Sequence, residues 1–173
     1  MKLRMFVVPA AILAVVLGIF FVASGQGRQR SFKASLNGYQ ETPAVSSTGS
    51  GEFRATVDRD NGSLTYELSY SNLEGAVTTA AHVHLGQTGV AGGVSFFLCG
   101  GGGKPLCPNT TGTVTGTVIA ADVIGPLGQG IAAGEFAEIL QAMRSGVTYA
   151  NVHTNKHPGG EIRGQISDNA SER

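Results

Sequence analysis

Three of the four histidines stand in strand-like segments at a spacing that metal sites use. His82 and His84 lie in Ala80-Ala81-His82-Val83-His84-Leu85-Gly86, and His153 lies in Tyr149-Ala150-Asn151-Val152-His153-Thr154. Residues two apart in a strand share a face. The alternate positions are apolar and are expected to meet the core, so the three imidazoles should face away from it. His-x-His with a third histidine from another strand is a spacing that copper and zinc sites use.

Other roles for these histidines stay open. Imidazoles also tie strands and turns together by hydrogen bonding, and that role requires no cofactor. His157 precedes Pro158-Gly159-Gly160 and is expected in an exposed turn, although it could supply a fourth ligand. If the histidines do hold an ion, copper and zinc are the expected ones.

The sequence does not favour an enzyme. It has no Gly-x-Ser-x-Gly motif, and no serine stands beside a histidine with an acidic partner in a recognisable order. No pair of carboxylates is singled out for acid–base chemistry. We therefore assign no catalytic residue.

Cys99 and Cys107 are the only cysteines and enclose a loop that contains four consecutive glycines. In an oxidising compartment, an even pair this close in sequence is most simply a disulfide. Closing so short a loop removes roughly 2.5 kcal/mol of chain entropy from the unfolded state. The alternative, a two-thiol metal or redox site, lacks the Cys-x-x-Cys spacing.

Alternating polar and apolar residues predict a chain made mostly of strands. Phe53, Ala55 and Val57 alternate with polar residues, and a second alternating run covers 64–70. Asn61-Gly62 lies between these runs and favours a type I′ hairpin turn. Further strands are expected over 31–37, 78–85, 93–98, 112–119, 147–154 and 161–167. The prediction is all-β: an antiparallel β-sandwich or flattened Greek-key-like barrel of about eight strands.

One interval has a helical period instead. Phe136, Ile139, Leu140 and Met143 fall on one face of a helix over 134–145, with Gly146 just past its end. We expect this short helix to close one end of the β-structure. Its methionine belongs to the core.

The N-terminus predicts export. Lys2 and Arg4 precede an uncharged stretch over 5–22, and Ala23-Ser24-Gly25 supplies small residues for cleavage. This pattern predicts a signal peptide over 1–25. The alternative is an uncleaved membrane anchor, because about 18 apolar residues can just span a bilayer. Either way, the remaining chain is expected to be secreted, periplasmic or at the cell surface.

Composition fits a single exported β-domain over 31–167, followed by a mobile tail over 168–173. The chain has 12 basic and 12 acidic residues, 14% charged residues, 26 glycines and no tryptophan. A neutral chain without basic clusters does not favour nucleic acid as a partner. The expected partner is an unknown extracellular or envelope ligand, and contact with a membrane is expected only through an uncleaved N-terminal segment.

The segments around the histidines resemble the CHRD domain, a module found in the developmental antagonist chordin and in secreted bacterial proteins. The resemblance rests on AHVHLG at 81–86 and on YANVHT followed by PGGEIRGQI at 149–166. The matching motif residues are Asn151, His153, Thr154, Gly160, Glu161, Arg163 and Gly164. The resemblance implies a β-domain that acts as a non-enzymatic binding or interaction module, and it implies that the two histidine strands are neighbours.

The same histidines give a more distant similarity to Cu,Zn superoxide dismutase, which implies an alternative function: a copper-binding or dismutase-like protein using His82, His84 and His153. The chain departs from that enzyme because no histidine occurs between residues 85 and 152. Its two cysteines also enclose a local loop. Glu161, Arg163 and Gln165 are expected on a solvated face of the last strand, where the first two could form a surface ion pair.

Overall fold

The structure is a computed structural model that describes residues 30–58 and 62–169. The strands of this part of the chain are β1 (Ser31–Asn37), β2 (Ser50–Asp58), β3 (Ser63–Ser71), β4 (Thr78–Leu85), β5 (Gly93–Cys99), β6 (Gly112–Val118), β7 (Thr148–Thr154), β8 (Ile162–Gln165) and β9 (Ser167–Asp168). The helices are α1 (Phe136–Arg144) and three 3₁₀ turns, η1 (Gly38–Gln40), η2 (Ala120–Asp122) and η3 (Leu127–Gln129).

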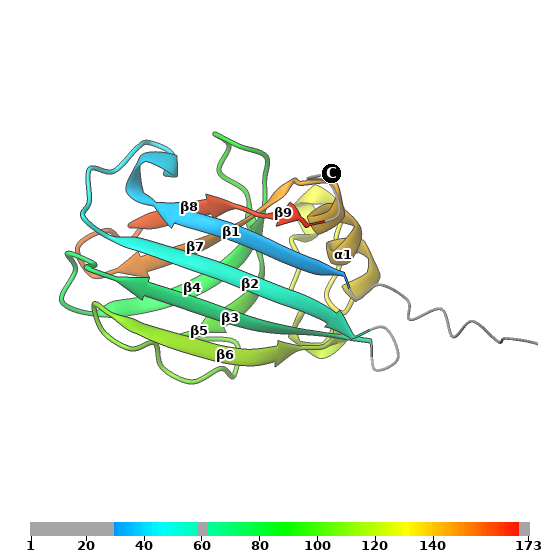
Figure 1. Ribbon diagram of the computed structural model, residues 1–173. Coiled ribbons are helices and arrows are strands. Elements are labelled where there is room, and N and C mark those ends of the chain that lie inside the picture. The colour runs from blue at the N-terminus through cyan, green and yellow to red at the C-terminus, as the bar shows by residue number, and fades with distance from the viewer. Residues whose placement is uncertain (1–29, 59–61, 170–173) are drawn as a thin grey trace, which may run out of the picture.

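All strand pairings are antiparallel and form one sheet in the order β5-β4-β7-β8-β1-β2-β3-β6, with the short β9 also paired to β1. The sheet curls into a barrel that is nearly closed (Figure 1). Across the remaining gap, the Tyr66 hydroxyl of β3 donates to the carbonyl of Leu98 in β5 at 2.7 Å. The all-β prediction is confirmed, in its barrel form.

The interior of the barrel follows the alternation seen in the sequence. Phe32 and Leu36 of β1, Phe53 of β2 and Leu64 and Leu68 of β3 are each at most 2% exposed. Their polar neighbours along the strands point outward. Because side chains alternate with period two, burying one face fixes the register of each strand.

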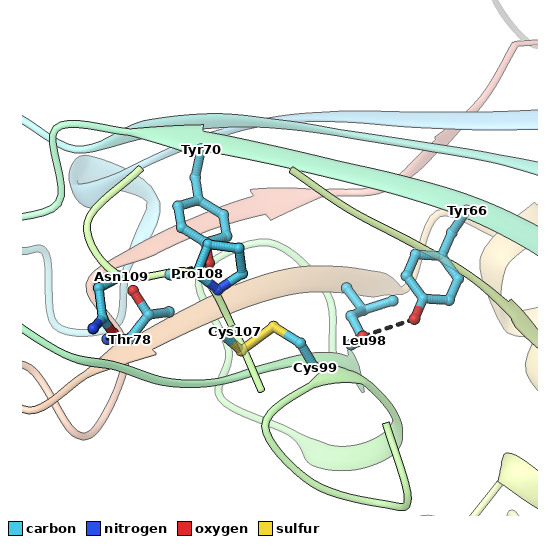
Figure 2. Close-up of a disulfide and its surroundings, with 8 residues drawn as sticks. All are labelled: Tyr66, Tyr70, Thr78, Leu98, Cys99, Cys107, Pro108 and Asn109. Carbon is cyan, nitrogen blue, oxygen red and sulfur yellow. Dashed lines mark hydrogen bonds between the residues drawn. A yellow bond between two sulfur atoms is a disulfide. The ribbon is translucent and has the colours of Figure 1, made fainter. Parts of the chain in front are cut away.

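Cys99 and Cys107 form a disulfide with an S–S distance of 2.01 Å, as predicted. It joins the end of β5 to the segment that leads into β6, close to the gap in the barrel (Figure 2). The Tyr70 hydroxyl donates to the carbonyl of Pro108, the residue after the second cysteine, at 2.5 Å. The disulfide and the two tyrosines thus link the two edges of the sheet.

The predicted helix is confirmed as α1, which lies at one end of the barrel beside β9 (Figure 1). Ile139 and Met143 are fully buried and Leu140 is 7% exposed, so these residues of the apolar stripe close this end of the core. Ser145 caps the helix C-terminus, and Gly146 follows with a φ of +67°.

Two details differ from the expectations. Order extends past residue 167, because β9 pairs with β1 and Asn169 bonds to the backbone and hydroxyl of Ser31. The first residue of the expected tail, Asp168, is therefore part of the sheet, and Asn169 is hydrogen-bonded to it. In β4 the expected alternation of buried positions does not continue from Ala81 to Thr79: Thr79 is exposed and Thr78 is buried, because the β4–β7 register shifts between Thr78 and Ala80.

Several expectations fall outside the described residues. These are the signal peptide or anchor over 1–25, the tip of the β2–β3 turn at 59–61 and the tail over 170–173. Within the ranges that the structure describes, no helix is both long and apolar enough to cross a membrane.

Candidate metal centre

Two paired strands bring three histidines together on the face of the sheet opposite the core. β4 and β7 pair so that His82 lies opposite Asn151 and Ala80 lies opposite His153. Ala81 and Val83 of β4 are fully buried on the other face. The imidazoles therefore face away from the core and the histidine strands are adjacent, as expected.

The three rings form a compact group. One ring nitrogen from each of His82, His84 and His153 lies within 4.8 Å of the others. The ring centroids are 4.8 Å apart for His82 and His153, 5.4 Å for His82 and His84, and 6.0 Å for His84 and His153. Nitrogens bound to one Zn²⁺ lie roughly 3.4 Å apart, given tetrahedral bonds of about 2.0–2.1 Å. The most distant ring nitrogens would have to approach each other by about 1.4 Å to bind an ion.

Two of the three rings form a hydrogen bond through Nδ1, which leaves a lone pair on Nε2. His84 Nδ1 is 3.0 Å from the carbonyl oxygen of Gly92, and His153 Nδ1 is 3.0 Å from that of Pro158. A carbonyl only accepts, so each Nδ1 carries the proton and each Nε2 of the neutral rings carries a lone pair. Both Nε2 atoms are buried without a partner, and so is His82 Nδ1. A carbonyl on the outer nitrogen is the usual way in which a metal-binding histidine is oriented.

Burial keeps the rings neutral. Burial, together with the neighbouring rings of His153 and His84, lowers the pKa of His82 to about 3. Burial likewise lowers the pKa of His84 to about 4, an effect that the bond to Gly92 opposes. The pKa of His153 is also lowered by burial. Near neutral pH all three imidazoles are therefore uncharged, with one ring nitrogen free of a proton, and this is the form that binds metals.

Aromatic residues surround the group. The ring of Tyr149 stacks on His84 with centroids 4.7 Å apart, and the ring of Phe97 is perpendicular to that of His82 with centroids 4.4 Å apart. The guanidinium carbon of Arg163 lies 3.4 Å from the centroid of the Tyr149 ring. His84 is 7% exposed and Tyr149 is 3% exposed, whereas His82 and His153 are only partly buried.

The loop after β4 needs a glycine at position 92. A Cβ there would overlap the backbone of Leu85. This close approach positions the Gly92 carbonyl at His84 Nδ1, and the Gly92 N–H donates to the Tyr149 hydroxyl at 3.1 Å. The glycine-rich stretch after the His-x-His motif therefore orients a histidine.

Glu41 covers the neighbouring part of this face. Its carboxylate accepts a hydrogen bond from Asn151 Nδ2 at 2.6 Å. Burial raises the pKa of Glu41 to about 7, although the bond from Asn151 and the charge of Arg163 oppose the rise. Gly160, with a φ of +128°, lies against both side chains, and a Cβ at this position would come within 2.6 Å of Glu41 Oε1.

The expected solvated face of the last strand is wrong for two of its residues. Glu161 precedes β8 and is fully buried, and Arg163 is 2% exposed. Glu161 accepts hydrogen bonds from Ser47 Oγ, from Thr154 Oγ1 and from the backbone N–H groups of Glu74 and Gly75. Burial opposes its ionisation, but these bonds outweigh burial and hold the pKa of Glu161 below its usual value.

The partners of Arg163 also differ from the expected ion pair with Glu161. The guanidinium donates to the carbonyl of Gln87 at 3.0 Å and to Thr42 Oγ1 at 3.3 Å. Neighbouring loops cover this face and supply acceptors for its buried donors. Gln165 Nε2 likewise donates to the carbonyls of Gly86 and Gly146.

The remaining motif residues join strands to one another. Asn151 also donates to the carbonyl of Ile162, and Gly164 lies where β8 passes the backbone of Ser35. His157 is partly buried and is not a member of the three-ring group. Its backbone N–H donates to Thr154 Oγ1. The turn position of His157 is confirmed, but its expected exposure is not.

Sequence reasoning missed the roles of Glu41, Phe97 and Tyr149. Glu41 follows β1 in a short polar loop whose sequence carries no recognisable signal. Tyr149 could have been identified, because it shares a strand face with Asn151 and His153.

Comparison with known proteins identifies one family. The sequence model of the CHRD domain matches residues 32–166. No curated protein and no solved structure matches this chain. The similarity to Cu,Zn superoxide dismutase is therefore not borne out, in keeping with the local disulfide and the histidine-free interval between residues 85 and 152.

Proposed function

This chain belongs to the CHRD domain family, and on that premise we propose that it is an exported, non-enzymatic binding module whose ligand is a transition-metal ion held by His82, His84 and His153. The observation that carries the proposal is that each ring of this close group has a buried nitrogen without a partner in the protein: Nδ1 of His82 and Nε2 of His84 and His153. A buried polar atom without a partner costs free energy. A bound ion would satisfy all three atoms at once.

The sequence left open the alternative that these histidines only tie strands and turns together by hydrogen bonds. This alternative explains fewer of the ring nitrogens. It accounts for Nδ1 of His84 and of His153, which bond to carbonyls. It does not account for Nδ1 of His82 or for Nε2 of His84 and His153, which have no partner. Three neutral imidazoles suit zinc and copper better than calcium or magnesium, which prefer oxygen ligands.

Export is part of the proposal. CHRD domains occur in extracellular or secreted proteins, and the Cys99–Cys107 disulfide suits an oxidising compartment. The N-terminal sequence has the pattern of a signal peptide. N-terminal sequencing of protein recovered outside the cytoplasm tests this, and a mature chain that begins at Gln26 is the expected result. A chain retained in the cytoplasm with Met1 intact would contradict export.

Metal binding is tested on untagged, exported protein. We expect one equivalent of zinc or copper per chain by elemental analysis after metal loading and desalting. The variant His82→Ala/His84→Ala/His153→Ala should lose it. His157→Ala is the matched control, since it removes the one histidine outside the group, and it should bind like the wild type. Equal metal content in all three proteins would leave only a structural role for the cluster.

A further inference from the structure

The charge around the three-histidine group restricts the ion that it can hold. No Asp, Glu or Cys from the ranges that the structure describes joins the group, so each candidate ligand is a neutral imidazole. The charged side chain that acts on His84 is a cation, Arg163, whose guanidinium lies against the ring of Tyr149. Tyr149 in turn stacks on His84. None of the three candidate ligands therefore carries a negative charge that would balance a bound cation.

The apolar surroundings on one side of the three-histidine group also restrict the ion that it can hold. Phe97 lies opposite His82 in the β4–β5 register, and the two rings are in perpendicular contact. Gly101 and Gly102 pack so closely on the Phe97 ring that a Cβ at either position would overlap it. These glycines belong to the loop closed by the Cys99–Cys107 disulfide. The disulfide loop thus holds an aromatic ring against one of the candidate ligands.

From these two observations we infer, on the basis of the metal-binding function proposed above, that the site selects a soft monovalent ion, cuprous copper. The cost of moving an ion out of water rises with the square of its charge, so a divalent ion pays about four times the penalty of a monovalent ion of the same size. Cuprous copper accepts three neutral nitrogen donors in a trigonal arrangement and needs no anion. Zinc or cupric copper would retain a net charge of two and would have to take an anionic fourth ligand from solution.

Competition titrations test the selectivity. Under anaerobic, chloride-free conditions, we expect bicinchoninate competition to show one cuprous ion per chain. Its affinity should exceed the affinity for Zn²⁺, measured by chelator competition, at least 100-fold. Added azide, an anionic ligand, should raise the Zn²⁺ affinity and leave the cuprous affinity unchanged.

A matched pair of variants tests the charge argument itself. Phe97→Asp places a carboxylate opposite His82, and Phe97→Asn places a neutral side chain of the same size there. The ratio of the cuprous affinity to the Zn²⁺ affinity should be at least tenfold smaller in Phe97→Asp than in Phe97→Asn. Both variants lose the aromatic ring, so they differ only in the added charge, and circular dichroism checks that both retain the β-structure.

The possible failures can be told apart. Zn²⁺ binding that depends on the three histidines and is as tight as cuprous binding would overturn the selectivity and leave the proposed function intact. Equal selectivity in the two Phe97 variants would overturn the charge argument. The absence of any bound metal would overturn both this inference and the proposed function.

Discussion

The phenol ring of Tyr149 lies parallel to the imidazole of His84, with the centroids 4.7 Å apart and the planes at 4°. The Tyr149 hydroxyl accepts a hydrogen bond from the N–H of Gly92, and the carbonyl of Gly92 is the partner of His84 Nδ1. One side chain therefore sets the plane of the imidazole and also holds the loop that fixes its tautomer.

This relationship predicts a graded effect on metal affinity. Tyr149→Phe keeps the stacked ring but loses the bond to the loop, and it should weaken binding several-fold. Tyr149→Leu fills much of the volume without stacking and should weaken binding by about 10–100-fold, the range for residues that orient metal ligands. Chelator competition measures both, and circular dichroism checks that the β-structure is retained. Wild-type affinity in the leucine variant would mean that the stack does not position His84.

The ionisation of Glu41 predicts a pH-dependent stability. Burial raises its pKa from 4.5 to about 7, so the folded protein binds the proton more tightly than the unfolded chain. Stability should therefore fall as the pH rises from about 4.5 to about 7 and should not change further because of this group. Urea unfolding at several pH values should show this slope in the wild type and a flatter one in Glu41→Gln. Parallel curves for the two proteins would contradict the shift.

The ionisation of Glu161 predicts the opposite dependence of stability on pH. Its pKa is lowered, so it contributes stability above its unfolded pKa, and that contribution is lost as the pH falls through the folded value. Glu161→Gln replaces a carboxylate oxygen that accepts hydrogen bonds with an NH₂ donor, and should reduce the free energy of unfolding by about 3 kcal/mol. The exposed Glu67→Gln is the control and should change it by less than about 0.5 kcal/mol. A loss of similar size in both variants would show that the bonds to Glu161 are not stabilising.

The helix at the end of the barrel predicts a large effect for one substitution. Leu140→Asp buries a charge without a partner and should lower the free energy of unfolding by several kcal/mol. Gln141→Asp makes the same change at the exposed next position of α1 and serves as the control. An unchanged melting temperature in Leu140→Asp would mean that α1 does not pack on the core.

Removal of the disulfide should cause a moderate loss of stability. Replacing both cysteines with serine should reduce the free energy of unfolding by roughly 2.5 kcal/mol, because the unfolded chain regains the entropy of the short loop. Denaturant unfolding of the wild type and the double variant measures it. The wild type treated with a reductant should match the variant, and two free thiols in exported protein would contradict the bond.

Local patterns in the sequence were sufficient for the elements of the fold. Alternation with period two identified the strands and their buried faces, as at Ala81 and Val83, because each side chain's face depends only on its own strand. The helical period over 136–143 identified α1 for the same reason. The short cysteine loop fixed its own pairing, since no other cysteine competes.

Only the tertiary structure decided what surrounds the histidines. Alternation turned His84 and His153 away from the core, but their proximity depends on the pairing of β4 with β7, strands separated by more than 60 residues. The burial of Glu161 could not be read from its strand, because its hydrogen-bond donors come from other segments. A strand pattern shows which side chains share a face. Whether that face meets water or a covering loop depends on long-range contacts, and here they turned an expected solvated face into a buried polar cluster.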